Sequence, residues 1–174
     1  MPSTESARAE VDLDALVQTY ASLLFRVAHS VLRNATEAED VVQDVFVRVL
    51  ERRRDLQEVR EMRVWLVRIA WNLALDRRRR VQPEQMDASF ARELAGASVP
   101  ADQALAEAER MAAVLREMER LPHGERHVLL LSAIQELRTE EMAKVLGRSE
   151  SATRALLFRA RTRLRERLDQ GARR

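Results

Sequence analysis

The chain of 174 residues carries a net charge of +2, and 46% of its residues are hydrophobic, so it can bury one moderate core or two small ones. It contains no cysteine, which excludes disulfides, thiolate metal sites and an internal redox switch. Aromatic residues make up only 4%, and glycine and proline number four each, which disfavours long strands joined by tight turns. The sequence predicts an all-α fold.

The N-terminal end gives no sign of export or membrane insertion. Residues 1–10 are polar and lack the apolar centre of a signal peptide. The most apolar stretch, 13–32, is interrupted by Gln18, Ser22, Arg26 and His29, which disfavours a transmembrane helix. We therefore expect a cytoplasmic protein with no membrane contact.

Two helices come first along the chain. Apolar residues from Leu13 to Val31 recur at helical spacing up to a break at Asn34. Thr36 and Glu39 have the spacing of a capping box, which predicts the start of the second helix. The apolar stripe of that helix consists of Val41, Val42, Val45, Phe46, Val49 and Leu50. Its other face carries Asp40, Gln43 and Asp44, and the residues alone favour plain solvated surface there.

A third helix follows a mostly charged loop at 52–60. Its predicted core side consists of Met62, Trp65, Leu66, Ile69 and Leu73. The opposite side carries Val64, Arg68, Trp71, Leu75 and Arg78. Trp71 has two interpretations: its ring stacks on the bases of an exposed single strand, or it covers a neighbouring domain or partner. Asp76 falls near the apolar side, so we expect it to be paired and structural.

Residues 81–103 contain two prolines, a glycine and several polar residues without an apolar period, which predicts a flexible linker. The chain then divides into an N-terminal helical domain, 1–80, and a C-terminal domain, 104–174. In the second domain a helical pattern stops at Leu121-Pro122 and resumes as far as Ile134. A short helix over 140–146 is followed by Gly147, placed to end it, and by Ser149, a natural N-cap for a last helix to about Leu168. This arrangement predicts a helix-turn-helix.

The last helix has a basic outer face. Thr153, Leu157, Ala160 and Leu164 are predicted to point inward. Small and basic residues point outward, as suits the DNA major groove: Ser151, Ala152, Arg154, Ala155 and Arg159. Residues 141–174 contain ten basic and four acidic side chains, a local charge of +6. A solvated, arginine-rich helix would give the same charge pattern.

An enzyme is not expected, and no cofactor is predicted. The three histidines are His29, His123 and His127, without a phosphate-binding loop or carboxylate cluster beside them. His123 and His127 could share a metal ion on a helix, but Glu125, the nearest carboxylate, lies off their face. We predict a plain surface pair of histidines.

In order and spacing, these segments resemble the extracytoplasmic-function (ECF) group of sigma factors, within the sigma-70 family, from about Leu13 to Leu168. Residues 38–46, Ala-Glu-Asp-Val-Val-Gln-Asp-Val-Phe, are similar to the segment that binds the β′ clamp helices of RNA polymerase. The resemblance implies polymerase contacts by Asp40, Gln43, Asp44 and Val47. Residues 63–79 are similar to the family helix that reads and opens the −10 element, with a flipped base held by the loop before it. The implied −10 contacts are Arg63, Arg68, Trp71, Asn72, Arg77, Arg78 and Arg79.

The C-terminal segments from Leu121-Pro122 to residues 159–161 resemble the family domain that binds the −35 element. The implied contacts are Arg148, Ser149, Ser151, Arg154, Ala155 and Arg159. The sequence departs from the family at Glu136, where glycine is usual, and at Arg138, where a serine often caps the next helix and Thr139 is expected to replace it. Outward positions that are commonly polar hold Ala152, Ala155 and Leu156. Fewer side chains can therefore bond base edges.

The resemblance implies three partners: core RNA polymerase, through its β′ clamp helices and β flap, promoter DNA, and an anti-sigma factor. It also implies a monomer within the holoenzyme. Two other functions stay open at this point. One is a stand-alone helix-turn-helix regulator whose first domain only dimerises. The other is a sigma-like adaptor that no longer initiates transcription.

Overall fold

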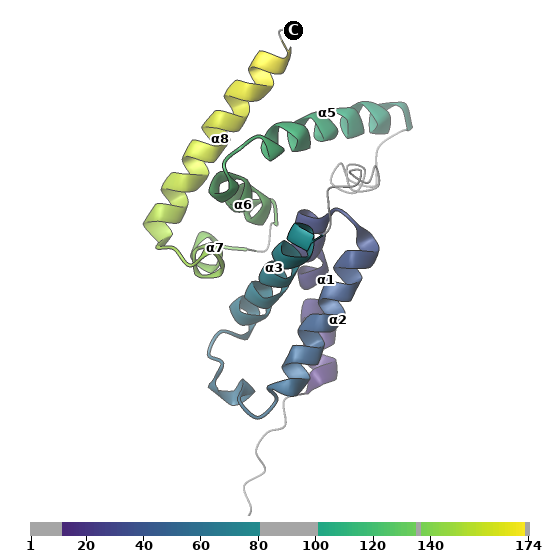
Figure 1. Ribbon diagram of the computed structural model, residues 1–174, viewed down its shortest axis with the longest axis vertical. Coiled ribbons are helices and arrows are strands. Elements are labelled where there is room, and N and C mark those ends of the chain that lie inside the picture. Colours follow the sequence, from purple (N-terminus) through teal and green to yellow (C-terminus); the bar gives the residue numbers. More distant parts are fainter. Residues whose placement is uncertain (1–11, 81–100, 135–136, 173–174) are drawn as a thin grey trace, which may run out of the picture.

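A computed structural model describes residues 12–80, 101–134 and 137–172, and every regular element among them is helical (Figure 1). The N-terminal domain contains α1 (Leu13–Leu32), α2 (Ala35–Glu51), the 3₁₀ turn η1 (Leu56–Glu58) and α3 (Met62–Arg80). The C-terminal domain contains α5 (Ala101–Glu119), α6 (His123–Ser132), α7 (Thr139–Leu146) and α8 (Glu150–Ala172). The structure therefore confirms the predicted all-α fold with a helix-turn-helix.

Polar caps set the starts of the first two helices. Asp12 Oδ1 accepts the Asp14 N–H at 3.0 Å and begins α1. Asn34 Oδ1 accepts the Glu37 N–H at 3.0 Å and begins α2. The predicted capping box at Thr36 is therefore wrong, because the asparagine two residues earlier already bonds the free N–H groups of the first turn.

The core of the N-terminal domain lies between α1, α2 and α3. Its fully buried side chains include Leu24, Val27 and Val31 of α1, Val41, Val45 and Val49 of α2, and Leu66 and Val67 of α3. In the predicted loop, Leu56 of η1 is also buried and holds the loop against the domain. Leu50, which was assigned to the apolar stripe of the second helix, is instead 49% exposed.

The buried side of α3 differs from the prediction. Its buried residues are Leu66, Val67, Ala70, Trp71 and Ala74. Ala70 and Ala74 are fully buried, and such small side chains let neighbouring helices approach closely. The prediction was based on large apolar side chains and gave alanine little weight. It therefore assigned Trp65, Ile69 and Leu73, which are only partly buried, to the core side. Asp76 was expected near the core, but its side chain is 54% exposed and lies 3.7 Å from Arg79.

In the C-terminal domain, α5 and α6 pack on α8, and α7 packs on α6 and α8. Gly147 has a φ of 64° and ends α7, and the Arg148 N–H donates to the Ala143 carbonyl at 2.9 Å. Ser149 Oγ accepts the Ala152 N–H at 3.2 Å, so the predicted N-cap of the last helix is confirmed. Thr153 Oγ1 donates to the Ser149 carbonyl at 2.9 Å from a fully buried position.

Three details of this domain correct the sequence predictions. Thr139 does not cap α7 but is its first residue, and Glu141 closes the helix start by accepting the Arg138 N–H at 2.8 Å. Leu156 does not point outward, because it is only 8% exposed and belongs to the core. The last helix continues past Leu168 to Ala172.

Residues 81–100 of the predicted linker lie outside the described residues, as does Glu136. The last three linker residues, 101–103, belong to α5, which begins at Ala101. The two domains are in contact, with α3 beside α7 and α1 beside α6 (Figure 1). None of the helices in the described part of the chain has the length and hydrophobicity that a membrane span requires.

Candidate nucleic-acid interface

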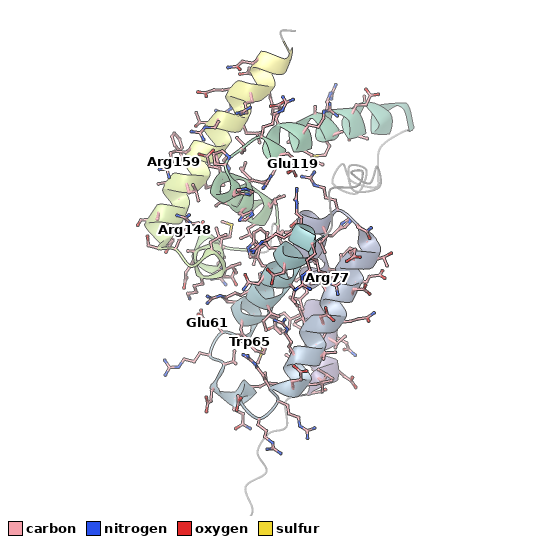
Figure 2. All side chains as sticks on the ribbon, in the orientation of Figure 1. Glu61, Trp65, Arg77, Glu119, Arg148 and Arg159 are labelled. Carbon is pink, nitrogen blue, oxygen red and sulfur yellow. The ribbon has the colours of Figure 1, made fainter. Side chains whose placement is uncertain are left out.

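The outer face of α8 is open to solvent. Ser151, Ala152, Arg154, Ala155 and Arg159 are all exposed, as predicted. Arg154 forms an ion pair with Glu150 one turn earlier, and Arg148 is exposed in the turn before the helix (Figure 2). Basic and small side chains thus stand at the free N-terminal half of the helix, which is the geometry that major-groove binding requires.

Phe158 also lies on this surface and was missed by the sequence analysis. Its side chain is 73% exposed. It stands four residues after Arg154, so one helical turn separates the ring from that guanidinium. Its position between the inward Leu157 and the outward Arg159 was the signal that could have identified it. The aromatic side chain extends the outer face of α8.

A second exposed face lies on α2, where polar and apolar side chains alternate by three and four residues. The side chains of Asp40 and Asp44 are 48% and 47% exposed. Val47 and Leu50 are 51% and 49% exposed, and Gln43 is exposed beside them. We call these five residues the α2 face. Such a row of exposed aliphatic side chains and carboxylates suits a protein-binding surface as well as a solvated one.

Arg77 of α3 is bound to the carboxylates of α2. Its guanidinium lies 2.8 Å from Asp44, 2.9 Å from Glu37 and 3.5 Å from Asp40. The hydrogen bond to Asp44 raises the pKa of Arg77 further above its ordinary value. A DNA phosphate would have to displace these carboxylates in order to bind Arg77. In this structure Arg77 therefore stabilises the carboxylates of α2.

The exposed side of α3 is not centred where the sequence placed it. Arg68, Asn72 and Arg79 are exposed. Trp65, labelled in Figure 2, is partly exposed and stands at helical spacing from them. The prediction that Trp71 lies on the solvent face is wrong, since it is 2% exposed. The aromatic ring that accompanies the exposed arginines is therefore that of Trp65.

Comparisons with known proteins match this arrangement. Residues 16–84 match the family model Sigma-70 region 2, and residues 111–164 match Sigma-70, region 4. The chain is 33% identical over 162 residues to the RNA polymerase sigma factor CnrH of Cupriavidus metallidurans, covering 88% of this chain and 85% of that protein. It is 27% identical to the ECF RNA polymerase sigma factor SigW of Bacillus subtilis, covering 88% and 87%. The chain belongs to the ECF group of the sigma-70 family.

Two further comparisons concern length and structure. The chain is 34% identical to the probable RNA polymerase sigma factor RfaY of Xanthomonas campestris pv. campestris, but it spans only 37% of that protein. The structure of CnrH in complex with the cytosolic domain of CnrY has a TM-score of 0.66 at 30% identity, covering 91% of this chain and 88% of that one. This sigma factor thus shares its two-domain fold with a solved relative.

In this sigma factor, region 4 covers part of the region 2 helix α3. The Trp71 ring meets the His127 ring edge-on, with centroids 5.3 Å apart. Arg63 Nε lies 3.1 Å from a Glu141 carboxylate oxygen of α7. Of the two interpretations of Trp71, the structure supports a ring that covers a neighbouring domain.

One carboxylate of region 4 joins both domains. Glu119 lies 2.8 Å from Arg33 and 2.7 Å from Arg78 of region 2, and 2.7 Å from Arg126 of region 4. Burial acts to raise the pKa of Glu119, but the hydrogen bonds and charge of Arg78, with Arg33 and Arg126, lower it below its ordinary value. We call these four residues the Glu119 cluster.

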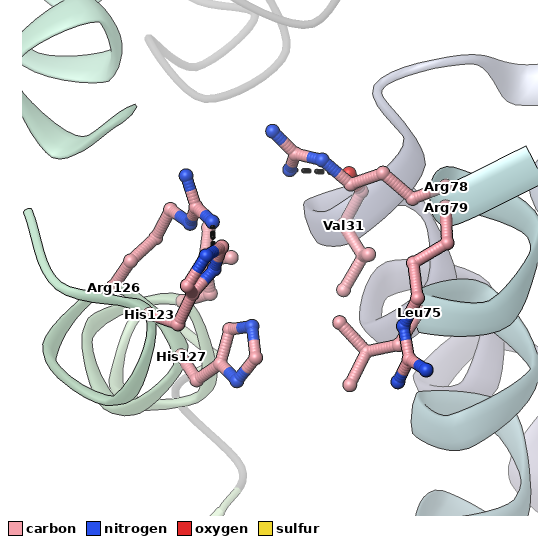
Figure 3. Close-up of a pocket in the computed structure, with 8 residues that line it drawn as sticks. Val31, Leu75, Arg78, Arg79, His123, Arg126 and His127 are labelled. Carbon is pink, nitrogen blue, oxygen red and sulfur yellow. Dashed lines mark hydrogen bonds between the residues drawn. The ribbon is translucent and has the colours of Figure 1, made fainter. Parts of the chain in front are cut away.

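A cavity of about 520 Å³ lies beside this cluster, between the domains (Figure 3). Its lining residues are Val31, Leu75, Arg78, Arg79, His123, Arg126, His127 and Leu130. His123 is exposed as predicted, whereas His127 is partly buried against Trp71, which corrects the surface pair. Burial, followed by the charge of Arg126, lowers the pKa of His127 to about 4. Within the described part of the chain, no three His, Cys, Asp or Glu side chains gather where a metal ion could bind.

Proposed function

We propose that this sigma factor docks on core RNA polymerase through the α2 face, with Asp40, Gln43, Asp44 and Val47 as contacts to the β′ clamp helices. The observation that carries the proposal is the α2 face itself. Two half-exposed carboxylates and two exposed aliphatic side chains stand in one row on the helix that the region 2 match includes. The ion pair with Arg77 orients the Asp44 carboxylate in the unbound protein, which lowers the entropy cost of binding.

The −10 contacts are proposed on α3. Arg68, Asn72 and Arg79 are exposed and can reach DNA from the structure as it stands, with Trp65 beside them as a stacking ring. Arg63 and Arg78 are paired with carboxylates of region 4, and Trp71 is buried against it. Arg77 is paired with carboxylates of α2, so these four side chains act only after a rearrangement.

The −35 contacts are proposed on the helix-turn-helix. Arg148, Ser149, Ser151, Arg154, Ala155 and Arg159 all lie on the exposed side of the turn and of α8. Only the arginines and serines among them can hydrogen-bond a base edge or a phosphate. We therefore propose that DNA shape and apolar contact contribute much of the −35 selectivity.

The proposed partners also include an anti-sigma factor, and the proposed setting is the cytoplasm, with the chain as a monomer in the holoenzyme. The complex of CnrH with the cytosolic domain of CnrY supports binding of this chain by another protein. The cavity between the domains offers apolar side chains and a surplus of cations to an acidic, amphipathic segment.

Run-off transcription tests the proposal. Purified protein is mixed with core RNA polymerase and a randomised promoter pool, and the templates that yield transcripts are sequenced. We expect the transcribed templates to share a motif linked to the start site. We also expect at least about a tenfold loss of transcript for Asp44→Arg, which reverses the charge of a proposed contact, and for Val47→Lys, which puts a charge in place of an apolar one. Glu109→Arg is the control, since it makes the same charge change at an exposed position of α5.

Either result of this assay is informative. If no transcript depends on the protein while another sigma factor works with the same polymerase, the adaptor or the stand-alone regulator takes the place of the proposal. If Glu109→Arg fails as badly as Asp44→Arg, the α2 face is not the docking surface.

A further inference from the structure

The contacts between the two domains are charged, specific and placed over the −10 contacts. Arg78 donates to both oxygens of Glu119 at 2.7 Å, and a bond to the Val31 carbonyl of its own domain at 3.0 Å orients its guanidinium. Lys144 of α7 bonds Glu61 at 2.5 Å, just before α3 begins. Together with the pairs of Arg63 and Trp71, these contacts run along one side of α3 from its start to its end. Region 4 therefore sits on the helix that is proposed to open DNA.

Arg33, one of the cluster's cations, ends α1 with a left-handed backbone. Arg33 is the only non-glycine residue with a positive φ in the described part of the chain, at 56°. Residues other than glycine, asparagine and aspartate adopt this left-handed backbone conformation at a cost in free energy. The residue is 8% exposed, and its guanidinium lies 2.8 Å from Glu119 of the other domain. The strained C-cap of α1 thus directs a buried cation across the domain boundary.

Glu119 is the single anion of the four-residue cluster. Three guanidinium groups, Arg33 and Arg78 from region 2 and Arg126 from region 4, share one carboxylate. With that carboxylate neutralised, two arginines of one domain face an arginine of the other with no anion between them. Like charges at such distances repel, so Glu119 determines whether the two domains attract or repel each other here.

We propose that the Glu119 cluster is an intramolecular latch, which holds region 4 over α3 and keeps Arg63, Trp71 and Arg78 from DNA until the domains separate. The proposal rests on the −10 role proposed for these residues. The α2 face and the outer face of α8 stay exposed in the latched chain, so polymerase can dock before the latch opens. The free protein then binds single-stranded DNA with an apparent Kd equal to the intrinsic Kd divided by the open fraction.

Two dyes on the full-length chain report the latch directly. The sequence contains no cysteine, so Thr36→Cys and Asp169→Cys, both at exposed helix positions, provide the only two labelling sites. Energy transfer between the dyes measures the distance between the domains. In the same samples, a short fluorescent single-stranded DNA of mixed sequence measures access to α3 by anisotropy.

The decisive variant is Glu119→Gln, and its matched control is Glu117→Gln. Glu117 lies on the same helix and pairs with Arg120 at 2.7 Å and Arg167 at 3.7 Å, both in the C-terminal domain. Arg33→Asn is a second latch variant, since asparagine accepts the left-handed backbone but removes the cation. We expect both latch variants to lengthen the dye distance and to bind the DNA about tenfold more tightly, while Glu117→Gln resembles the unmodified chain.

Three results would overturn the proposal. An unchanged dye distance in Glu119→Gln and Arg33→Asn would show that the cluster does not hold the domains. An equal change in Glu117→Gln would show that helix α5 responds to any lost charge. A longer distance without tighter DNA binding would show that closure does not control access to α3. Failure of the sigma function is separate from these, because it would appear as absent run-off transcription while the dye distances still responded to the variants.

Discussion

At the scale of single residues, the two tryptophans exchange the roles that their spacing suggested. Trp71 is buried where the domains meet, and Trp65 is partly exposed beside Arg68 and Asn72. A large ring at a domain contact contributes through the apolar area that it removes from water, whereas a ring at a rim is free to stack on a ligand. The two side chains should therefore differ in what their removal damages.

Truncation of each tryptophan separates stability from promoter opening. We expect Trp71→Ala to lower the free energy of unfolding by about 3 kcal/mol, because it leaves a cavity between buried helices. Trp65→Ala should cost less than about 1.5 kcal/mol and still reduce run-off transcription severalfold, since a stacking ring is lost. Urea unfolding followed by circular dichroism gives the first quantity. Equal stability losses in the two variants would contradict the assignment.

At the scale of elements, the helix-turn-helix depends on the backbone at Gly147 and the cap at Ser149. Gly147 needs its left-handed φ of 64° to reverse the chain, whereas Gly171 lies within α8, with a negative φ and open space around it. The same mutation has opposite consequences at the two sites, because an added Cβ is strained in the first and favours helix in the second.

The pair Gly147→Ala and Gly171→Ala tests this local requirement. We expect Gly147→Ala to destabilise the chain by about 1 kcal/mol and Gly171→Ala to stabilise it by up to about 0.5 kcal/mol, less than at mid-helix because it lies near the end. Thermal unfolding of both variants beside the parent chain measures the difference. A higher melting temperature for Gly147→Ala would show that the turn does not need a left-handed residue.

The elements themselves could be predicted from local signals, but the pairing of their faces could not. Gly147, Ser149 and Pro122 mark helix ends through backbone and capping chemistry, and they were placed correctly. The side of α3 was misjudged because this helix packs on α1 and α2 and also on region 4, so its buried residues face more than one partner. The ion pairs of Arg33 and Arg77 join distant parts of the sequence, and no local spacing reveals them.

At the scale of the whole molecule, the domain contact contains His127, a side chain that titrates near neutral pH when it is hydrated. His127 packs its ring on Trp71, and the basic side chains that face it are Arg126 and His123 of α6 and Arg78 and Arg79 of α3. Burial and these charges lower its pKa to about 4 in the closed chain. In an open chain the ring would be hydrated, and its pKa would return towards the ordinary value of about 6.5.

Closure should therefore weaken as the pH falls below about 6.5, by linkage between protonation and opening. Above that pH the ring is neutral in both states and closure is at full strength. Between pH 6.5 and pH 4 only the open chain takes up the proton, which favours opening. Below pH 4 the ring is protonated in both states, and its contribution to the free energy of closure is fully lost. We expect the free energy of domain closure to become about 1 kcal/mol less favourable from pH 7 to pH 5. This is less than a fully desolvated ring would give, because solvent screens part of the effect. The dye distance, measured across this range, provides the readout.

Substitution of each histidine identifies the group responsible. His127→Phe keeps a flat ring against Trp71 but cannot take up a proton, so its dye distance should stay constant between pH 7 and pH 5. His123→Asn removes the exposed neighbour and should leave the pH dependence in place, since the buried ring is still present. Glu119 cannot produce the effect in this range, because its arginine partners hold its pKa below the ordinary carboxyl value. If His127→Phe opens with falling pH as the parent chain does, protonation of this ring does not control the contact between the domains.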